Sequence, residues 1–167
     1  AGGARMVGRK IGLTSKLVQK QLGVDRPDFG ILFDDMAIPD GEEVDTSSLL
    51  APRVEAEITY VLEKDINFEK PTNSEVINAI AYATPSIEIV DSRVKDWNIK
   101  IQDTVADNAS AVLYVVGNQK VKLDEFDGRM CGMVMESKGE PVSVGAGAAC
   151  LGHPINAVRW LAEEMVQ

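Results

Sequence analysis

The chain has 167 residues, of which 45% are hydrophobic and 26% charged, and its formal net charge is −9. This size and composition fit one globular domain, and the acidity excludes a nucleic-acid-binding protein, which needs clustered Lys and Arg. The sequence contains no apolar run of roughly 20 residues, as a membrane span requires, no signal peptide and no short cysteine pairing. We therefore expect a cytoplasmic protein without a disulfide framework.

The first elements in chain order are a strand and a helix. Residues 6–13 predict a strand with a glycine-marked exit. Residues 14–23 predict a helix that Thr14 or Ser15 caps and Gly23 ends. The stretch 25–41 is rich in Pro and Gly and predicts a loop, with a short strand over 31–33 inside it.

Residues 53–63 alternate strictly between two kinds of side chain, which indicates a strand. The remaining predicted elements are a helix over 72–83, strands over 86–91 and 111–116, a hairpin over 131–137 and 140–144, and a final helix from Pro154. Strands outnumber helices and do not alternate with them, so we expect a mixed, strand-rich α+β fold in a single domain over 1–167. Since the chain starts without Met and stops inside a predicted helix, we expect this domain to be incomplete at both ends.

Three glutamates form the candidate chemical centre. Glu55 and Glu57 are two residues apart in a predicted strand and therefore face the same side. Glu88 lies between Ile87 and Ile89 in another predicted strand, and a carboxylate with apolar neighbours needs a partner. Three carboxylates without a nearby His or Cys would select a hard cation, Mg²⁺ or Mn²⁺. The alternative from spacing alone is a solvated strand face, which Glu-x-Glu patterns commonly form.

Six short blocks in order resemble the 2-hydroxypentadienoate (vinylpyruvate) hydratase and 4-oxalocrotonate decarboxylase family of the fumarylacetoacetase superfamily. The blocks are 10–15 (KIGLTS), 27–30 (PDFG), 52–57 (PRVEAE), 85–88 (PSIE), 107–110 (DNAS) and 151–154 (LGHP). The resemblance covers essentially the whole chain, with similar spacing between the blocks. It implies a fumarylacetoacetase-like fold with peripheral helices.

The resemblance also implies roles for individual residues. Glu55, Glu57 and Glu88 would bind the divalent metal. Lys10 would be the active-site lysine and Asp28 the acidic group paired with it, so these two are the candidate catalytic residues. The substrate pocket would include Asp107, Asn108 and Ser110. Without the family, Lys10 reads as a surface lysine, Asp28 as a turn residue after Pro27, and the 107–108 pair as a capped loop.

The activity that the resemblance implies is hydration of 2-hydroxypenta-2,4-dienoate to 4-hydroxy-2-oxopentanoate, in the meta-cleavage degradation of aromatic compounds. The run 91–105 is closer to the hydratases, and 4-oxalocrotonate decarboxylase is the alternative. A catalytically silent subunit that binds metal or a partner is a further alternative. A hydrolase is disfavoured, because it needs a His–carboxylate pair and the single histidine, His153, precedes a helix that it would cap. The family also implies a homo-oligomer that can associate with the partner decarboxylase.

Overall fold

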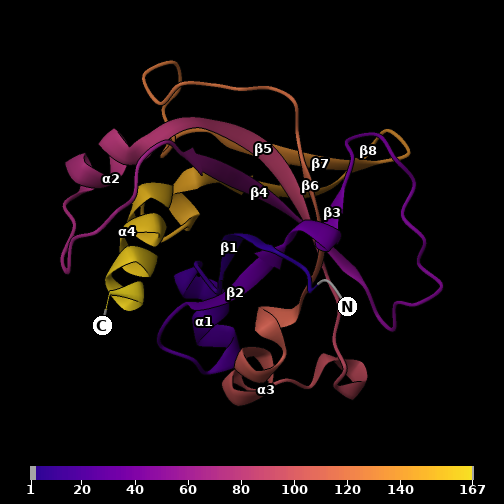
Figure 1. The fold of residues 1–167 in the computed structure, drawn as a ribbon. Coiled ribbons are helices and arrows are strands. Elements are labelled where there is room, and N and C mark those ends of the chain that lie inside the picture. Colours follow the sequence, from indigo (N-terminus) through magenta and orange to yellow (C-terminus); the bar gives the residue numbers. More distant parts are fainter. Residues whose placement is uncertain (1–2, 167) are drawn as a thin grey trace.

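A four-stranded mixed sheet forms the centre of the fold in the computed structural model, which describes residues 3–166 (Figure 1). Its strands lie in the order β3 (Ala37–Ile38), β6 (Ala111–Val116), β5 (Ile80–Val90) and β4 (Arg53–Leu62). The β3–β6 pair is parallel, and the other two pairs are antiparallel. The predicted mixed, strand-rich α+β class is therefore confirmed.

The pairing of β4 with β5 brings the three glutamates to one place. Glu55 lies directly opposite Glu88, and Glu57 lies opposite Ser86. Because side chains alternate along a strand, Glu55 and Glu57 share the sheet face on which their partners stand. A shift of the register by one residue would turn these side chains to the other face.

A separate two-stranded antiparallel sheet consists of β1 (Met6–Gly12) and β2 (Asp28–Phe33), joined through α1 (Lys16–Leu22). The predicted first strand and helix are confirmed. The helix begins after Ser15, whose hydroxyl accepts from the Val18 amide, and it ends at Gly23 with a φ of 67°. The loop predicted over 25–41 is partly wrong, because β2 spans six residues rather than the three of the predicted strand.

The buried side of α1 is polar. Leu17 and Leu22 are exposed, whereas Gln19 is buried and donates to the Leu13 carbonyl at 2.6 Å. A buried amide group that finds a backbone partner does not incur the cost of an unpaired polar group. The apolar spacing along this helix therefore does not mark its packing face.

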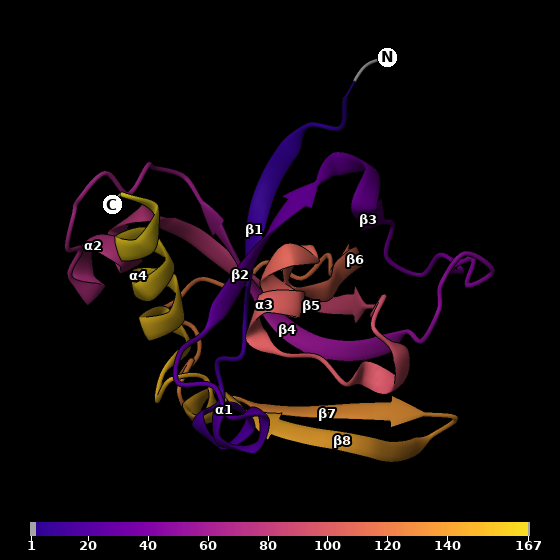
Figure 2. The ribbon, with the colours of Figure 1, turned by 90° about the horizontal axis from the view of Figure 1, so that it is seen from below.

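Helices α2 (Asn73–Ala79) and α4 (Pro154–Met165) lie together at one end of the sheet (Figure 1). Val76, Ile80 and Ile155 form the buried core between them and β5. Another two-stranded antiparallel sheet, formed by β7 (Gly132–Ser137) and β8 (Glu140–Ala146), confirms the predicted hairpin. In Figure 2 this hairpin runs along one side of the molecule, away from β1 and β2.

Two predicted boundaries are wrong and one helix was missed. The helix predicted over 72–83 ends at Ala79, because residues from Ile80 onward pair with β4, and β5 is therefore longer than the predicted 86–91. The short helix α3 (Ile101–Ala106) lies in a polar stretch without a clear apolar period. Among residues 3–166, no helix has the length and apolar character needed to cross a membrane.

Candidate metal centre

Three carboxylates converge where β4 and β5 pair. One side-chain oxygen each from Glu55, Glu57 and Glu88 lies within 4.8 Å of the other two. Neighbouring strands stand only about 4.8 Å apart, so opposite and diagonal side chains on one face come this close without any special loop. Like charges at this separation repel each other unless a cation or protons neutralise them.

The cluster carries more negative charge than its protein neighbours neutralise. Glu88 is only 5% exposed, and its Oε1 has no hydrogen-bond partner within the described residues. Burial raises the pKa of Glu88, and the Glu55 and Asp28 carboxylates add to this effect, while Lys10 opposes it. The pKa of Glu57 is raised to about 7 by crowding of protein atoms around its carboxyl and by the charges of Glu55 and Glu88, although much of its side chain still reaches solvent.

A divalent cation fits this arrangement. A buried carboxylate oxygen without a donor is costly, and a cation would satisfy it and offset the mutual repulsion. An all-oxygen set of three carboxylates matches the preference of a hard cation with open positions for water or substrate. The sequence prediction of an acidic cluster able to bind a divalent metal is confirmed at this level.

Lys10 lies beside the cluster. Its side chain is 10% exposed, its Nζ pairs with Glu88 Oε2 at 3.0 Å, and it donates to the Ala109 carbonyl at 3.0 Å. Lys10 is thus nearly buried, which contradicts the alternative of a surface lysine. Two of its three N–H groups are engaged in these contacts, which leaves one for a water or substrate.

Asp28 lies on the same side of the β1–β2 pair. It is buried, and its Oδ2 accepts a hydrogen bond of 3.0 Å from the Thr104 hydroxyl of α3. A Cβ added at Gly12, the register partner of Asp28, would meet both Asp28 Oδ1 and Lys10 Nζ. The ion pair of Lys10 is made with Glu88, while Asp28 stands next to the lysine and takes its hydrogen bond from Thr104.

The 107–110 segment, predicted as part of a substrate pocket, lies against β2 and β6. Asp107 pairs with Arg93 at 3.2 Å. Both polar atoms of the Asn108 side chain bond to the backbone of Ile31. Ser110 is buried, and its carbonyl accepts from the Asp91 amide. The structure brings this segment to Lys10 through Ala109, and its role in substrate binding stays a prediction.

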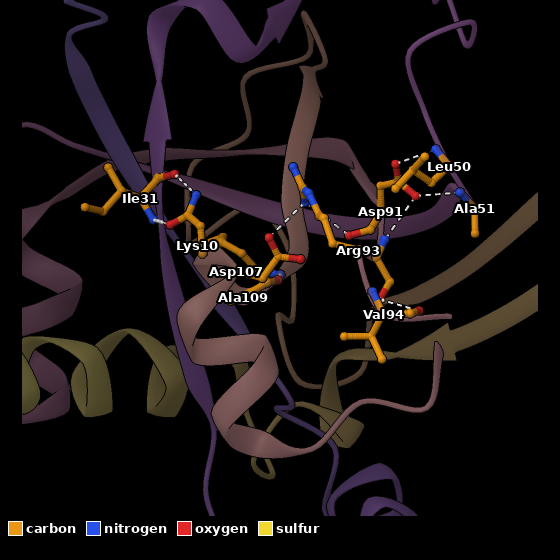
Figure 3. A network of polar contacts seen from close by, with 11 residues as sticks. Lys10, Ile31, Leu50, Ala51, Asp91, Arg93, Val94, Asp107 and Ala109 are labelled. Carbon is orange, nitrogen blue, oxygen red and sulfur yellow. Dashed lines mark hydrogen bonds and ion pairs between the residues drawn. The ribbon is translucent and has the colours of Figure 1, made fainter. Parts of the chain in front are cut away.

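Asp91 and Arg93 were not singled out from the sequence. The Asp91 carboxylate accepts from the amides of Leu50, Ala51 and Ser92 at 2.7–3.0 Å. Figure 3 shows Arg93 between Asp91 and Asp107, with Leu50 and Ala51 beyond Asp91. We call Asp91 with these three amides the Asp91 hub. The sequence feature that could have indicated it is the Asp-Ser pair directly after a strand, which is typical of an Asx turn.

His153 takes the predicted capping role. Its Nδ1 accepts from the Ile155 amide at 3.1 Å, which places it at the start of α4. Trp160 packs near Phe29, and the Arg53 guanidinium lies 4.3 Å from the ring centroid of Trp97.

Comparison with known sequences finds close relatives. No protein-family model matches the chain. The chain is 57% identical over 163 residues to 2-keto-4-pentenoate hydratase of Paraburkholderia xenovorans (strain LB400), which covers 98% of this chain and 61% of that protein. It is 50% identical over 166 residues to 2-hydroxypent-2,4-dienoate hydratase of Pseudomonas putida, which covers 99% of this chain and 75% of that protein.

Solved structures agree with these relatives. The fold matches 4-oxalocrotonate decarboxylase from Pseudomonas putida G7, complexed with magnesium and adipate, with a TM-score of 0.92 and 42% identity over 97% of this chain and 62% of that chain. Fumarylpyruvate hydrolase from Pseudomonas aeruginosa, in complex with Mn²⁺ and pyruvate, matches with a TM-score of 0.72 and 12% identity over 96% of this chain and 72% of that chain. The second match shows the fold alone. The chain spans less than two thirds of the length of the first relative and of the decarboxylase.

Proposed function

Because this chain belongs to the family of 2-hydroxypentadienoate hydratases and 4-oxalocrotonate decarboxylases, we propose that it acts as a metal-dependent hydratase. The reaction adds water to 2-hydroxypenta-2,4-dienoate and gives 4-hydroxy-2-oxopentanoate, a step in the meta-cleavage degradation of aromatic compounds. The observation that carries the proposal is the cluster of Glu55, Glu57 and Glu88, in which one Glu88 oxygen has no hydrogen-bond partner within residues 3–166, beside the nearly buried Lys10.

Glu55, Glu57 and Glu88 would hold the cation, and Mg²⁺ or Mn²⁺ is the proposed metal. A divalent cation bound there supplies Lewis-acid stabilisation of negative charge on the C2 oxygen of the substrate. The solved 4-oxalocrotonate decarboxylase holds magnesium, and the fumarylpyruvate hydrolase holds Mn²⁺. Both ions suit a site made of oxygen ligands with open positions.

The chain's own residues would handle the protons. In the hydratase reaction the C2 hydroxyl loses a proton and C5 gains one. Water then gives up one proton as its oxygen bonds to C4, and C3 takes up a proton. Lys10 Nζ keeps one N–H group for a donor role, and the nearby Asp28 offers a carboxylate acceptor. We assign proton movement to these two residues, and we propose that the segment with Asp107, Asn108 and Ser110 forms part of the substrate pocket.

The second candidate is 4-oxalocrotonate decarboxylase activity. It is favoured by the structural match at a TM-score of 0.92. Hydration and decarboxylation both need a stabilised enolate, so the same carboxylates serve either reaction. The higher identity to the hydratases, 57% against 42%, favours hydration.

The test is an assay with both substrates in parallel. The protein is incubated with Mg²⁺ or Mn²⁺ and either 2-hydroxypentadienoate or 4-oxalocrotonate, and the loss of dienol absorbance and the release of CO₂ are followed. We expect metal-dependent loss of the pentadienoate with formation of 4-hydroxy-2-oxopentanoate, and no turnover after chelation. Turnover of neither substrate with metal present would reject the enzyme and favour a silent metal-binding or partner subunit.

A matched pair of variants separates the metal site from general acidity. Glu57→Gln removes one carboxylate of the cluster and should abolish turnover. Glu63→Gln makes the same change at an exposed residue after β4, whose partner is Lys64 at 3.4 Å, and should keep normal rates. Normal activity of the Glu57 variant would refute the ligand assignment.

We also propose that the protein forms a homo-oligomer in the cytoplasm and associates with the partner decarboxylase of the same pathway. Only the family supports this. Size-exclusion chromatography with light scattering on the protein alone and mixed with the decarboxylase measures both associations, and a monomer in each case would contradict them.

A further inference from the structure

The turn before β6 has an unusual backbone. Asn108, Ala109 and Ser110 have φ angles of 53°, 54° and 58°, so three successive residues other than glycine are left-handed. Each such residue costs free energy, with the smallest cost at Asn. A run of this kind persists only where the surrounding structure enforces it, and such runs concentrate at functional sites.

Two contacts hold the turn in place. The Asn108 side chain bonds Ile31 twice, accepting from its amide at 2.7 Å and donating to its carbonyl at 2.9 Å. At the preceding position, Asp107 pairs with Arg93 at 3.2 Å. Gly30 permits the close approach, because a Cβ there would collide with the backbone carbonyl of Asn108.

This arrangement fixes the direction of the Ala109 carbonyl. Ala109 O accepts from Lys10 Nζ at 3.0 Å, and the same Nζ pairs with Glu88 Oε2 at 3.0 Å. Lys10 is the register partner of Gly30, next to Ile31 on β2. The two Asn108–Ile31 hydrogen bonds form a clamp, and they are made at the residue of β2 next to the register partner of Lys10. The Ala109 carbonyl of the clamped turn therefore fixes the Lys10 ammonium group.

We propose that Asn108 is a positioning residue that holds the 108–110 turn on β2 and thereby fixes the Lys10 ammonium group. This deepens the proposed function and rests on it for the importance of Lys10. In this proposal the Asn108 side chain does not contact the substrate, because both of its polar atoms already bond Ile31. Its effect on the reaction passes through Ala109 and Lys10.

The first test measures Lys10 directly and needs no turnover. Asn108→Gly removes the clamp but leaves a residue that adopts positive φ without cost. Trace acetylation followed by peptide mass spectrometry should show about a tenfold faster reaction of Lys10, which corresponds to the loss of about one charge-assisted hydrogen bond. Lys64, an exposed lysine of the same chain, provides the internal reference and should not change. An unchanged Lys10 rate in the folded variant overturns the proposal.

The second test separates positioning from substrate contact. In Asn108→Gly we expect kcat to fall about tenfold with KM within about twofold, and no additional fall when Lys10→Met is already present. A raised KM with unchanged kcat, or a full additional loss in the Lys10 variant, would mean direct substrate contact and overturn the proposal. Asn118→Gly, which removes an exposed amide bonded to Asp40, is the control and should match the parent.

Two further results keep the outcomes distinct. If Asn108→Gly does not fold, Asn108→Asp keeps the acceptor for the Ile31 amide and loses only the donor, so it should raise the Lys10 acetylation rate by a smaller factor. An unchanged rate in that variant overturns the proposal as well. If the parent protein turns over no substrate, the proposed function fails, while the acetylation rates still decide whether Asn108 positions Lys10.

Discussion

Two buried carboxylates near the end of β5 have opposite surroundings. Glu88 is 5% exposed and Asp91 is 3% exposed, and only three positions separate them. Glu88 faces two other carboxylates and keeps one oxygen without a partner among the described residues, and its pKa is raised. At Asp91 burial acts to raise the pKa, but three backbone amides and Arg93 outweigh it and lower the pKa.

The difference distinguishes a carboxylate whose donors all belong to the fold from a carboxylate of the proposed metal site. Asp91 is saturated by donors that belong to the fold, so its charge is stabilised as soon as the chain folds. Lys10 offsets part of the negative charge of the Glu55, Glu57 and Glu88 cluster, and the remaining charge is neutralised only when a cation or protons bind. Perturbed carboxylates of this second kind mark functional sites. Four experiments test this difference between Asp91 and the glutamate cluster, and they follow in order of expected effect.

The largest effect is expected for Asp91→Ala. The substitution leaves the amides of Leu50, Ala51 and Ser92 without their acceptor, which costs about 3 kcal/mol of unfolding free energy. Urea unfolding measures this loss. Asp45→Ala is the control, since Asp45 is exposed and bonds to Ser47, two residues away in the same loop. Equal losses of unfolding free energy in the two variants would contradict the role of Asp91 as the acceptor for these three amides.

The next effect is expected for Glu57→Gln on metal binding. Loss of one carboxylate of the cluster should weaken Mn²⁺ binding by at least about 100-fold, since even changes in residues behind the ligands cost about 10–100-fold. Isothermal titration calorimetry measures the affinity. The metal-free variant should be as stable as the parent or more stable, because repulsion with Glu55 and Glu88 is removed. A marked loss of metal-free stability would place Glu57 with Asp91 as a structural carboxylate.

A smaller effect is expected in the pH dependence of the metal-free protein. The pKa of Glu57 is about 7 in the folded chain against an ordinary value of 4.5, so the folded state binds more protons between these values. Stability should therefore fall as pH rises from 4.5 to 7. Because Glu57 is partly open to water, which screens the shift, we expect a change of about 1 kcal/mol.

Urea unfolding in EDTA at several pH values measures this fall, and the slope should become shallower in Glu57→Gln, in which the raised pKa of Glu88 remains. Asp91 has the opposite sign. Its lowered pKa gives stability that is present above its ordinary value of 3.8 and is lost as pH falls through the folded value. A parent protein whose stability is flat between pH 4.5 and 7 would remove the contrast.

An effect of about the same size is expected for Thr104→Val. Asp28 lies between the two extremes, because it is buried and takes a hydrogen bond from a single side chain, the Thr104 hydroxyl. Loss of that donor should cost about 1 kcal/mol of stability. Thermal unfolding measures it, with Thr46→Val, in the exposed loop before β4, as the control. A cost no larger than that of the control would mean that Asp28 does not depend on this bond.

Much of the fold follows from local pattern. Strict alternation over 53–63 predicts β4, and the caps Ser15 and Thr72 mark the starts of α1 and α2, since each depends only on residues close in sequence. Tertiary context overrode the pattern elsewhere. The helix predicted through residue 83 gave way to β5 once β4 offered pairing partners, and Gln19 rather than the leucines became buried.

The sequence by itself determined which carboxylates stand on one strand face, because the period of two is a local property of the chain. Only the tertiary structure decided that Glu88 stands opposite Glu55, that Lys10 pairs with Glu88, and that Asn108 uses both ends of its amide on Ile31. These contacts join residues far apart in sequence, up to 78 positions for Lys10 and Glu88. Their geometry depends on strand register and on Gly30, which lets β2 approach the Asn108 backbone. A local sequence pattern encodes neither of these.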